Sequence, residues 1–253
     1  MHKDSSFEYK EWAARVFGPE KCVFAGDALL QASFQPGSPW FDKIWAAIAG
    51  LEEELVLRLL ADCKGNNVPG IIAEFGVFKG TWINILNGML DKLNWDRQLW
   101  GFDSFEGLSK PHSTYDSTFW QEGSFKASLE EVRANVLADD RPRIKLVKGF
   151  FSESLSGAEA QSVEAVAYAR IDCDLYEPTV DCLNYLSTRL SHGSVLVFDD
   201  WTYFLGGGET KAFAEWVETV PDLEFEFLFF AAWGRFHVRC WHKGRSRHTA
   251  GIP

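Results

Sequence analysis

Several features that would point to particular protein classes are missing from this sequence. Its 253 residues contain no run near the roughly 20 apolar residues that a transmembrane helix needs, and the first residues lack an apolar signal-peptide core. The five cysteines form no C-x-x-C pair, and their odd number argues against a disulfide framework. The H-E-x-x-H and G-x-S-x-G motifs of zinc proteases and serine hydrolases do not occur. We therefore expect a cytoplasmic protein with reduced thiols and no membrane partner.

Basic residues are scarce relative to acidic ones. The chain has 25 Lys and Arg against 36 Asp and Glu, a formal net charge of −11. Nucleic-acid binding usually requires a basic patch, and the one basic concentration, residues 243–247, lies near the C-terminal end. We therefore expect no nucleic-acid partner. Aromatic residues are plentiful by contrast, with 11 Trp and 21 Phe, and a surplus of rings suits a pocket for a bulky, partly apolar ligand.

The first part of the chain reads as a helical segment. Apolar residues recur at helical spacing over 40–60, which predicts an amphipathic helix. A loop signal at 64–67 closes this segment, so we place a first unit at 1–67. It is expected to cover a pocket or to pair with another subunit in a homo-oligomer.

Strand and helix patterns alternate through the rest of the chain. Ser128 and Glu131 form a capping box at one helix start, a second helix is expected from Pro178 to Leu190 with its stop at His192-Gly193, and a third over 210–217. Apolar runs predict five strands and then a hairpin, at 71–73, 98–102, 144–147, 166–171, 195–198, 224–229 and 235–240. The pattern predicts an α/β fold with a doubly wound, mostly parallel sheet and an antiparallel C-terminal hairpin, over 68–243, followed by a tail at 244–253.

Two loops that follow predicted strands carry ligand-binding features. Glu74, Gly76 and Gly80 lie in the first strand-to-helix turn, where glycines let the backbone approach a ligand and the helix N-terminus offers free amides. Asp103, followed by Ser104, ends the second strand, and an acid there typically accepts hydrogen bonds from ribose hydroxyls. The glycines could simply form a tight turn, and Asp103 could simply cap a helix. The two features indicate a cofactor site only when they are taken together.

Four aspartates follow two buried strands. The fourth strand breaks into Asp172 and Asp174, and the fifth into Asp199 and Asp200. If the two strands are neighbours, Asp172, Asp199 and Asp200 meet, and three hard oxygen donors favour Mg²⁺, or Mn²⁺, over zinc. Helix capping explains Asp200 but not why both strands end in acids. Asp174 should point the same way as Asp172 if the backbone stays extended, and a carboxylate there can take a proton.

Two histidines are alternative candidates for the base. His112 lies in the long loop over 104–125, which is expected to close over the site. His237 lies inside a predicted strand, where a histidine is more often structural. Neither belongs to a recognisable motif.

With these residues in view, the sequence resembles the family of class I S-adenosylmethionine-dependent O-methyltransferases typified by macrocin O-methyltransferase. The resemblance extends from about Ile72 to Phe213. It implies a Rossmann-like seven-stranded fold, and an activity that methylates a hydroxyl of a sugar in a natural product or glycan with Mg²⁺ as second cofactor. The matching segments, in order, are 74–80, 101–108, 149–155, 170–179 and 199–201.

The resemblance also implies a role for each matching residue. The expected cofactor-binding residues are Glu74, Gly76 and Gly80 for the methionine part, Asp103 and Ser104 for the ribose, Gly149 and Phe151 for the adenine, and Asp172. The expected Mg²⁺ ligands are Asp172, Asp199 and Asp200, and Asp174 matches the acid proposed as general base.

Four positions depart from the family pattern near the expected acceptor. Cys173 stands in place of a glycine, Pro178 of a serine, Trp201 of a tyrosine and Ser156 of a proline. These departures bear on the acceptor, a hydroxylated small molecule that is expected to carry a sugar, more than on the chemistry.

Two other functions fit part of the sequence. Asp172-Cys173-Asp174 is also the D-x-D pattern of a metal-dependent glycosyltransferase, although that function leaves Glu74 and Asp103 unexplained. A non-catalytic, cofactor-binding scaffold of the same fold is the second alternative, and the intact set of four aspartates argues against it.

Overall fold

The structure, a computed structural model, describes residues 9–17, 39–201, 206–231 and 234–247. Within these ranges a seven-stranded sheet has the order β3-β2-β1-β4-β5-β7-β6. Neighbours among β1 to β5 run parallel, and β7 is antiparallel to both β5 and β6. The strands are β1 Ile71–Phe75, β2 Leu99–Asp103, β3 Ile144–Lys148, β4 Val166–Ile171, β5 Leu190–Phe198, β6 Leu223–Phe230 and β7 Phe236–His242. The predicted mostly parallel sheet with a C-terminal hairpin is confirmed.

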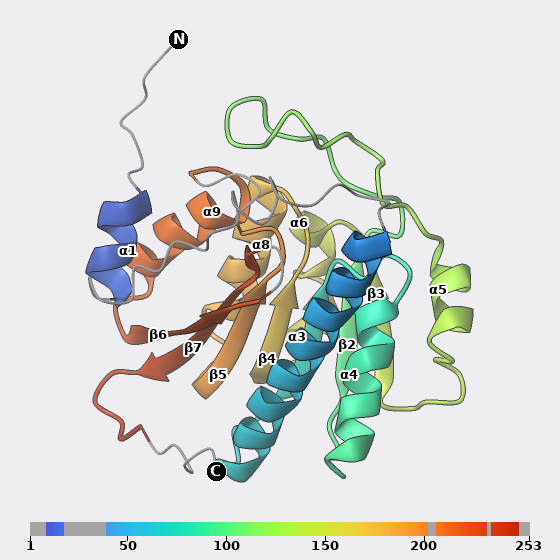
Figure 1. Cartoon of the computed structure of the whole chain (residues 1–253), viewed down its shortest axis with the longest axis horizontal. Helices are drawn as coiled ribbons and strands as arrows, with labels where there is room; N and C mark the ends of the chain where they lie inside the picture. Colours follow the sequence, from blue (N-terminus) through green and yellow to red (C-terminus); the bar gives the residue numbers. More distant parts are fainter. Residues whose placement is uncertain (1–8, 18–38, 202–205, 232–233, 248–253) are drawn as a thin grey trace.

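Helices cover both faces of the sheet (Figure 1). Successive residues of β5 point to opposite faces, so Val195 and Val197 join the core beneath α3 and α4, while Leu196 and Phe198 join the core beneath α8 and α9. Because both faces are covered, the central strands are almost continuously apolar. The helices are α1 Tyr9–Phe17, α3 Pro39–Gly65, α4 Thr81–Lys92, α5 Leu129–Asn135, α6 Phe151–Ser154, α7 Ala158–Gln161, α8 Tyr176–Leu186 and α9 Gly208–Trp216.

The ends of α8 differ from the prediction. The helix begins at Tyr176, and Pro178 lies in its first turn, where no backbone donor is needed. It ends at Leu186, so the expected continuation to a stop at His192-Gly193 is wrong. Both residues belong to β5, and Gly193, with φ of +93°, lies where the β4–β5 register shifts. A glycine with positive φ therefore marks a bulge in this strand and not a helix end.

Other boundaries agree with the sequence patterns. The backbone N–H of Glu131 donates to Ser128 Oγ at 3.1 Å, as the capping box predicted. Helix α3 continues past residue 60 to Gly65. The beginning of the expected tail packs on the sheet, because Arg247 pairs with Glu224; residues 248–253, like 1–8 and 18–38 of the N-terminal segment, lie outside the described residues. Within the described ranges, no helix has the length and apolar character of a membrane span.

Candidate active site

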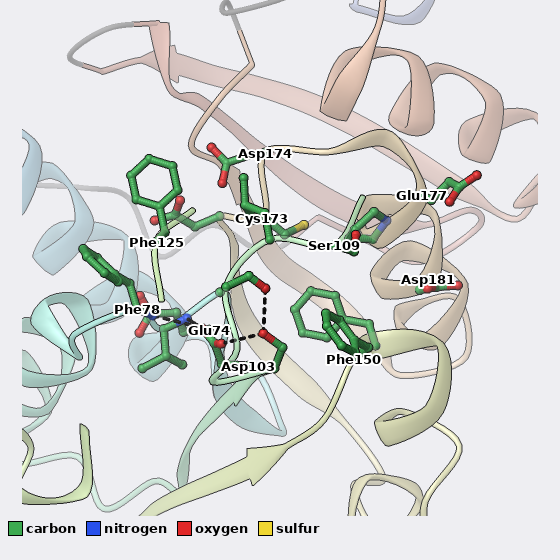
Figure 2. A pocket seen from close by; sticks show the side chains of 18 of the residues that line it. Glu74, Phe78, Asp103, Ser109, Phe125, Phe150, Cys173, Asp174, Glu177 and Asp181 are labelled. Atoms are coloured by element: carbon green, nitrogen blue, oxygen red, sulfur yellow. Dashed lines mark hydrogen bonds between the residues drawn. The ribbon is translucent and has the colours of Figure 1, made fainter. Parts of the chain in front are cut away.

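A cavity of about 580 Å³ lies at the carboxyl ends of the parallel strands. Its walls come from the β1–α4 turn, the loop after β2, the start of α6 and the β4–α8 turn. In Figure 2, Glu74 and Asp103 lie between aromatic rings, with Phe78 and Phe125 on one side and Phe150 on the other. The volume is within the roughly 300–1,000 Å³ of small-molecule sites. The cavity is at the sheet edge where strand-end residues were expected to meet.

The glycines of the β1–α4 turn allow the backbone to pack closely. Gly76 has φ of +91°, and a Cβ there would lie 1.7 Å from the carbonyl oxygen of Asp172. Gly80 has φ of +82°, and its Cβ would lie 2.4 Å from Val136 Cγ1. Both positions therefore require glycine. Gly76 lines the cavity, whereas Gly80 lies behind its wall.

Asp103 supports the glycine turn from the end of β2. Its Oδ2 accepts hydrogen bonds from the backbone N–H groups of Val77 at 2.7 Å and Phe78 at 2.9 Å (Figure 2). Its Oδ1 accepts from Phe105 N–H at 2.6 Å. Phe78 and Phe105 both have positive φ, which Asp103 helps to maintain. The carboxylate thus joins two loops of the cavity wall, and its ribose contact stays a prediction.

The other residues predicted on the ribose and adenine sides also hold loops in place. Ser104 lines the cavity while its Oγ donates to the Gly107 carbonyl at 2.8 Å and accepts from Glu106 N–H at 3.0 Å. Gly149 N–H donates to the Asp103 carbonyl at 2.9 Å. Phe151 begins α6 and lines the cavity, whereas Gly149 does not.

Glu74 is a buried acid in the cavity wall. It is 1% exposed, and its Oε2 has no hydrogen-bond partner among the described residues. Burial raises its pKa well above the ordinary value, and the positive charge of Arg170 offsets only part of that effect. A buried carboxyl group with a free oxygen is suited to a cationic ligand.

Asp172, Asp199 and Asp200 come together as predicted. One carboxylate oxygen of each lies within 4.8 Å of the others. Of the three, Asp172 lines the cavity. Asp200 is 9% exposed, and its Oδ2 has no partner in the described part of the chain. These carboxylates fit a divalent cation with oxygen ligands, because their distances and free oxygen leave room for one.

Asp174 reaches the same place by a different backbone path from the expected one. Strand β4 ends at Ile171, and Asp174 has φ of +62°, so the extended backbone on which its direction was predicted is absent. Asp174 nevertheless lines the cavity, and its carboxyl group lies near enough to that of Asp200 for the two like charges to interact. Burial, and then the charge of Asp172, raise the pKa of Asp174 to about 7.

Two arginines connect the aspartates to helix α3. Arg170, which is 0% exposed, forms ion pairs with Asp199 and with Glu52, whose nearest oxygen is 3.5 Å from Nη1. Arg235 pairs with the same two acids, at 2.6 Å to Glu52 and 2.5 Å to Asp199. The guanidinium of Arg170 also lies 3.9 Å from the centre of the Trp82 ring. The one sign of this network in the sequence is a charged residue, Arg170, inside an otherwise apolar strand.

Glu209 is a further acid that sequence reasoning missed. It is 1% exposed and accepts a hydrogen bond from Asp200 N–H at 3.0 Å. Its Oε1 has no partner among the residues that the structure describes, and burial raises its pKa well above the ordinary value. Glu209 lies in the first turn of α9, where an acid has an ordinary explanation, so its position in the sequence gave no hint of the site.

The histidines lie away from the cavity wall. His112 stacks on Tyr115, with ring centres 4.3 Å apart, and its Nδ1 accepts from the N–H groups of Thr114 and Tyr115. His237 is fully buried against Phe229, and burial lowers its pKa to about 3. Neither lines the cavity, so the geometry favours Asp174 as the base.

The long loop over 104–125, green at the top of Figure 1, is tied to two helices. Asp116 accepts from Tyr176 N–H at the start of α8 and from His112 N–H, both at 2.7 Å. Gly208 N–H, at the start of α9, donates to the Tyr115 carbonyl at 2.7 Å. The loop therefore has an anchored middle and contributes Phe125 to the cavity wall.

Comparison with known proteins supports an O-methyltransferase. A family model described as Macrocin-O-methyltransferase (TylF) matches residues 54–216. The 8-demethyl-8-(2,3-dimethoxy-alpha-L-rhamnosyl)-tetracenomycin-C 4'-O-methyltransferase of Streptomyces olivaceus is 31% identical over 201 residues, 69% of this chain and 73% of that protein. Demethyldecarbamoylnovobiocin O-methyltransferase of Streptomyces niveus is 31% identical over 178 residues, 65% of each chain.

Solved structures agree with the fold. The O-methyltransferase NovP has a TM-score of 0.63 and 26% identity, covering 77% of this chain and 80% of NovP. The calicheamicin methyltransferase CalS11 has a TM-score of 0.60 and 22% identity, covering 96% and 95% of the two chains. The second likeness bears on the fold alone. The predicted Rossmann-like methyltransferase fold is thereby confirmed.

Proposed function

Because this chain belongs to the macrocin O-methyltransferase family, we propose that it transfers the methyl group of S-adenosylmethionine to a sugar hydroxyl of a natural product or glycan, with Mg²⁺ at the acidic centre. One observation carries the proposal: three carboxylates from two neighbouring strands, Asp172, Asp199 and Asp200, lie within 4.8 Å of one another beside a cavity. The relatives named above, whose names give a rhamnosyl tetracenomycin and demethyldecarbamoylnovobiocin as substrates, agree with this substrate class.

The cofactor is proposed to bind along the β1 and β2 ends. Glu74 would accept its ammonium group, because the buried carboxyl group has an oxygen without a partner in the described chain. Gly76 keeps the backbone of the turn open to the methionine part, and Asp103 holds that turn through Val77 and Phe78. S-Adenosylmethionine supplies a methyl group on a positively charged sulfur.

The cation is proposed to bind Asp172, Asp199 and Asp200. Hard carboxylate oxygens select Mg²⁺, and Mn²⁺ suits the same donors. When bound, Mg²⁺ would fix two neighbouring hydroxyls of the acceptor and lower the pKa of one. Glu209 would support this centre by holding the backbone of Asp200 through their 3.0 Å hydrogen bond.

Asp174 is proposed as the general base. Its carboxyl group lines the cavity beside Asp200, so a hydroxyl held at the acidic centre lies within its reach. As the acceptor oxygen forms a bond to the methyl carbon, the carbon–sulfur bond breaks and the hydroxyl proton passes to Asp174. The products are the methyl ether and S-adenosylhomocysteine.

A row of aromatic side chains leads outward from the cavity and supports an acceptor with an apolar ring system. Phe78 lies edge-on to Phe125 at 5.7 Å between ring centres, Phe125 to Trp120 at 5.9 Å, and Trp120 to Phe119 at 4.9 Å. Phe78, Phe125 and Phe119 are 36%, 47% and 68% exposed. Exposed rings beside a cavity favour an apolar ligand, here the part of the acceptor beyond the sugar.

The charge of the cavity wall argues against a nucleotide-activated sugar as acceptor. Acidic side chains outnumber basic ones, and both arginines are already paired with carboxylates. The acidic residues of the wall are Glu74, Asp103, Glu122, Glu153, Asp172, Asp174, Glu177 and Asp181, and the basic ones are Lys79, Lys110, Arg170 and Arg235. A diphosphate would meet this excess of like charge, so a neutral glycoside is the proposed acceptor.

A paired methyl-transfer assay tests the proposal. The protein is incubated with S-adenosylmethionine and Mg²⁺, and with either aryl glycosides that carry vicinal hydroxyls or nucleoside-diphosphate sugars. Methylation of the glycosides is expected, with loss of activity in EDTA and recovery on adding Mg²⁺. Unchanged turnover in EDTA would refute the role of the metal, and methylation of the nucleotide sugars alone would refute the proposed acceptor.

The two other functions considered from the sequence have distinct outcomes. The family match favours methyl transfer over the glycosyltransferase that Asp172-Cys173-Asp174 suggested. Calorimetry distinguishes them directly, because a glycosyltransferase would bind a nucleotide sugar and not S-adenosylmethionine. A scaffold would bind the cofactor and form no methylated product with any glycoside.

A further inference from the structure

We infer that Glu52 of helix α3 is a positioning residue that sets the cation affinity of the acidic centre by restraining Arg170 and Arg235. The inference rests on the proposed metal centre and adds to it a control by residues outside the cation's own ligands. It also gives a function to α3, whose contribution the sequence left open.

The contacts form a closed network around Asp199. Arg235 lies between Glu52 and Asp199, with Nη1 2.6 Å from Glu52 Oε2 and Nε 2.5 Å from Asp199 Oδ1. Arg170 pairs with the same oxygen of Asp199, and its Nε is 3.6 Å from Asp172 Oδ2. Each arginine therefore contacts Glu52 on one side and a proposed cation ligand on the other.

The network is buried, so its charges act strongly on one another. Arg170 and Glu52 have side chains that are 0% and 1% exposed, and those of Arg235 and Asp199 are 15% and 14% exposed. Water therefore screens these charges poorly, and each acid or base changes the electrostatic potential at Asp199. A cation bound there meets a potential that depends on Glu52, although Glu52 does not reach it.

The direction of the effect follows from competition. Two guanidinium groups and a cation compete for the carboxylates of Asp199 and Asp172. Glu52 also attracts both arginines, and its negative charge balances one of their two positive charges. Without the charge of Glu52, the arginines bind the aspartates more tightly and the local potential becomes more positive. Both changes weaken cation binding, and removal of an arginine charge strengthens it.

Glu52 and Arg235 are also features of this chain beyond the family match. The family model covers residues 54–216, and both residues lie outside it. They come from elements far apart in the sequence, α3 and the segment just before β7, and the fold brings them together in an ion pair beside Asp199.

A purely structural role for Glu52 makes a different prediction. If the residue only ties α3 to the sheet, replacing it lowers the melting temperature and leaves cation binding unchanged in the protein that remains folded. Cation affinity measured without cofactor or acceptor therefore separates positioning from stability.

The experiment is calorimetric titration of Mg²⁺, and separately of Mn²⁺, into the full-length protein and its variants without cofactor or acceptor. Glu52→Gln keeps the size of the side chain and is expected to weaken Mg²⁺ binding by at least about fivefold. Arg235→Gln is expected to tighten it by a similar factor of about five. The double variant, Glu52→Gln with Arg235→Gln, should return toward the wild-type affinity, because the two charges cancel.

A control variant comes from the same helix. Glu53 is the exposed neighbour of Glu52, and Glu53→Gln changes the net charge of the protein equally. It is expected to leave Mg²⁺ affinity within about twofold, since charges in water are screened. Melting curves of all variants establish that the titrated protein is folded.

Each outcome decides the inference. Wild-type protein that binds neither Mg²⁺ nor Mn²⁺ overturns the metal centre and this inference together. Wild-type binding that Glu52→Gln leaves unchanged, or weakening by Arg235→Gln, overturns the inference alone. If Glu52→Gln does not fold, the Arg235→Gln variant still tests the inference. Tighter Mg²⁺ binding supports it, and weaker binding overturns it.

Discussion

Helix α3 buries two acids in surroundings that differ in charge balance. Asp62 pairs with Arg239 at 2.5 Å, with both side chains about 5% exposed, and the two charges cancel. Glu52 belongs to a group with more acids than bases, in which Glu74, Asp200 and Glu209 have oxygens without partners in the described chain. The first arrangement has no net charge without a ligand. The second has an excess of acids, which suits a ligand of positive charge, and this difference is why we propose it as the site.

The largest expected effect tests the function of the group that has more acids than bases. Asp174→Asn removes the proposed base while keeping the size of the side chain. We expect kcat to fall by about 10²–10⁴-fold, the usual contribution of a general base. Steady-state methyl-transfer kinetics measure the change.

Binding provides the control for this variant. The dissociation constant of S-adenosylmethionine, measured by calorimetry, should stay near the wild-type value because Asp174 does not form the proposed cofactor contacts. Full activity of Asp174→Asn would remove Asp174 from the mechanism.

The next effect tests the pair of Asp62 and Arg239. Asp62→Asn leaves Arg239 buried without its counter-charge, so we expect the free energy of unfolding to fall by about 3–5 kcal/mol, as when one partner of a buried pair is removed. Denaturant unfolding measures it. Activity per folded molecule should not change, because the pair lies outside the cavity wall.

An exposed pair on the same helix is the matched control. Glu54 and Arg58 are 52% and 58% exposed, and Glu54→Gln should cost less than about 0.5 kcal/mol. Equal losses of unfolding free energy in the Asp62 and Glu54 variants would show that burial does not determine the energetic cost of breaking an ion pair.

The last expected effect is a pH dependence of stability. The pKa of Glu74 is raised by burial above its ordinary value of 4.5, so the folded protein binds this proton more tightly than the unfolded chain. The resulting stability is complete below about pH 4.5 and is lost as pH rises toward the folded pKa. Between the unfolded and folded pKa values the loss is about 1.4 kcal/mol for each pH unit.

Glu74→Gln removes this titration. Relative to wild type, its melting temperature should therefore increase as pH rises above about 4.5. S-Adenosylmethionine should stabilise the wild type more than the variant, because Glu74 contributes its proposed ammonium contact. A difference between the two proteins that does not vary with pH would contradict the buried-acid explanation.

Sequence patterns predicted strands and local caps well and helix ends less well. The alternation of apolar runs placed all seven strands in the described chain, and the Ser128 cap forms as expected. The end of α8 was misjudged because His192-Gly193 has the local chemistry of a helix stop, whereas its conformation is set by pairing with β4. A glycine with positive φ serves either purpose, and only the neighbouring strand decides between them.

In the candidate site, too, some features could be predicted from local sequence and others depend on tertiary structure. Asp172, Asp199 and Asp200 were predictable because parallel strands that lie side by side deliver their last residues to the same edge. Asp174 was predicted for the wrong reason, since its direction comes from a left-handed turn. Asp103 was predicted as a ribose ligand, and the structure shows it accepting hydrogen bonds from the amides of two loops.

By itself, the sequence determined the elements and their strand-end acids, because apolar periodicity and local capping depend on near neighbours. Tertiary structure alone decided which charges share a buried space. Glu52, Arg170, Asp199 and Arg235 are separated by up to 183 positions along the chain and meet in one ion-pair network. No local pattern encodes such a meeting, because the electrostatic energy of a buried charge depends on distance through space and not on separation along the chain.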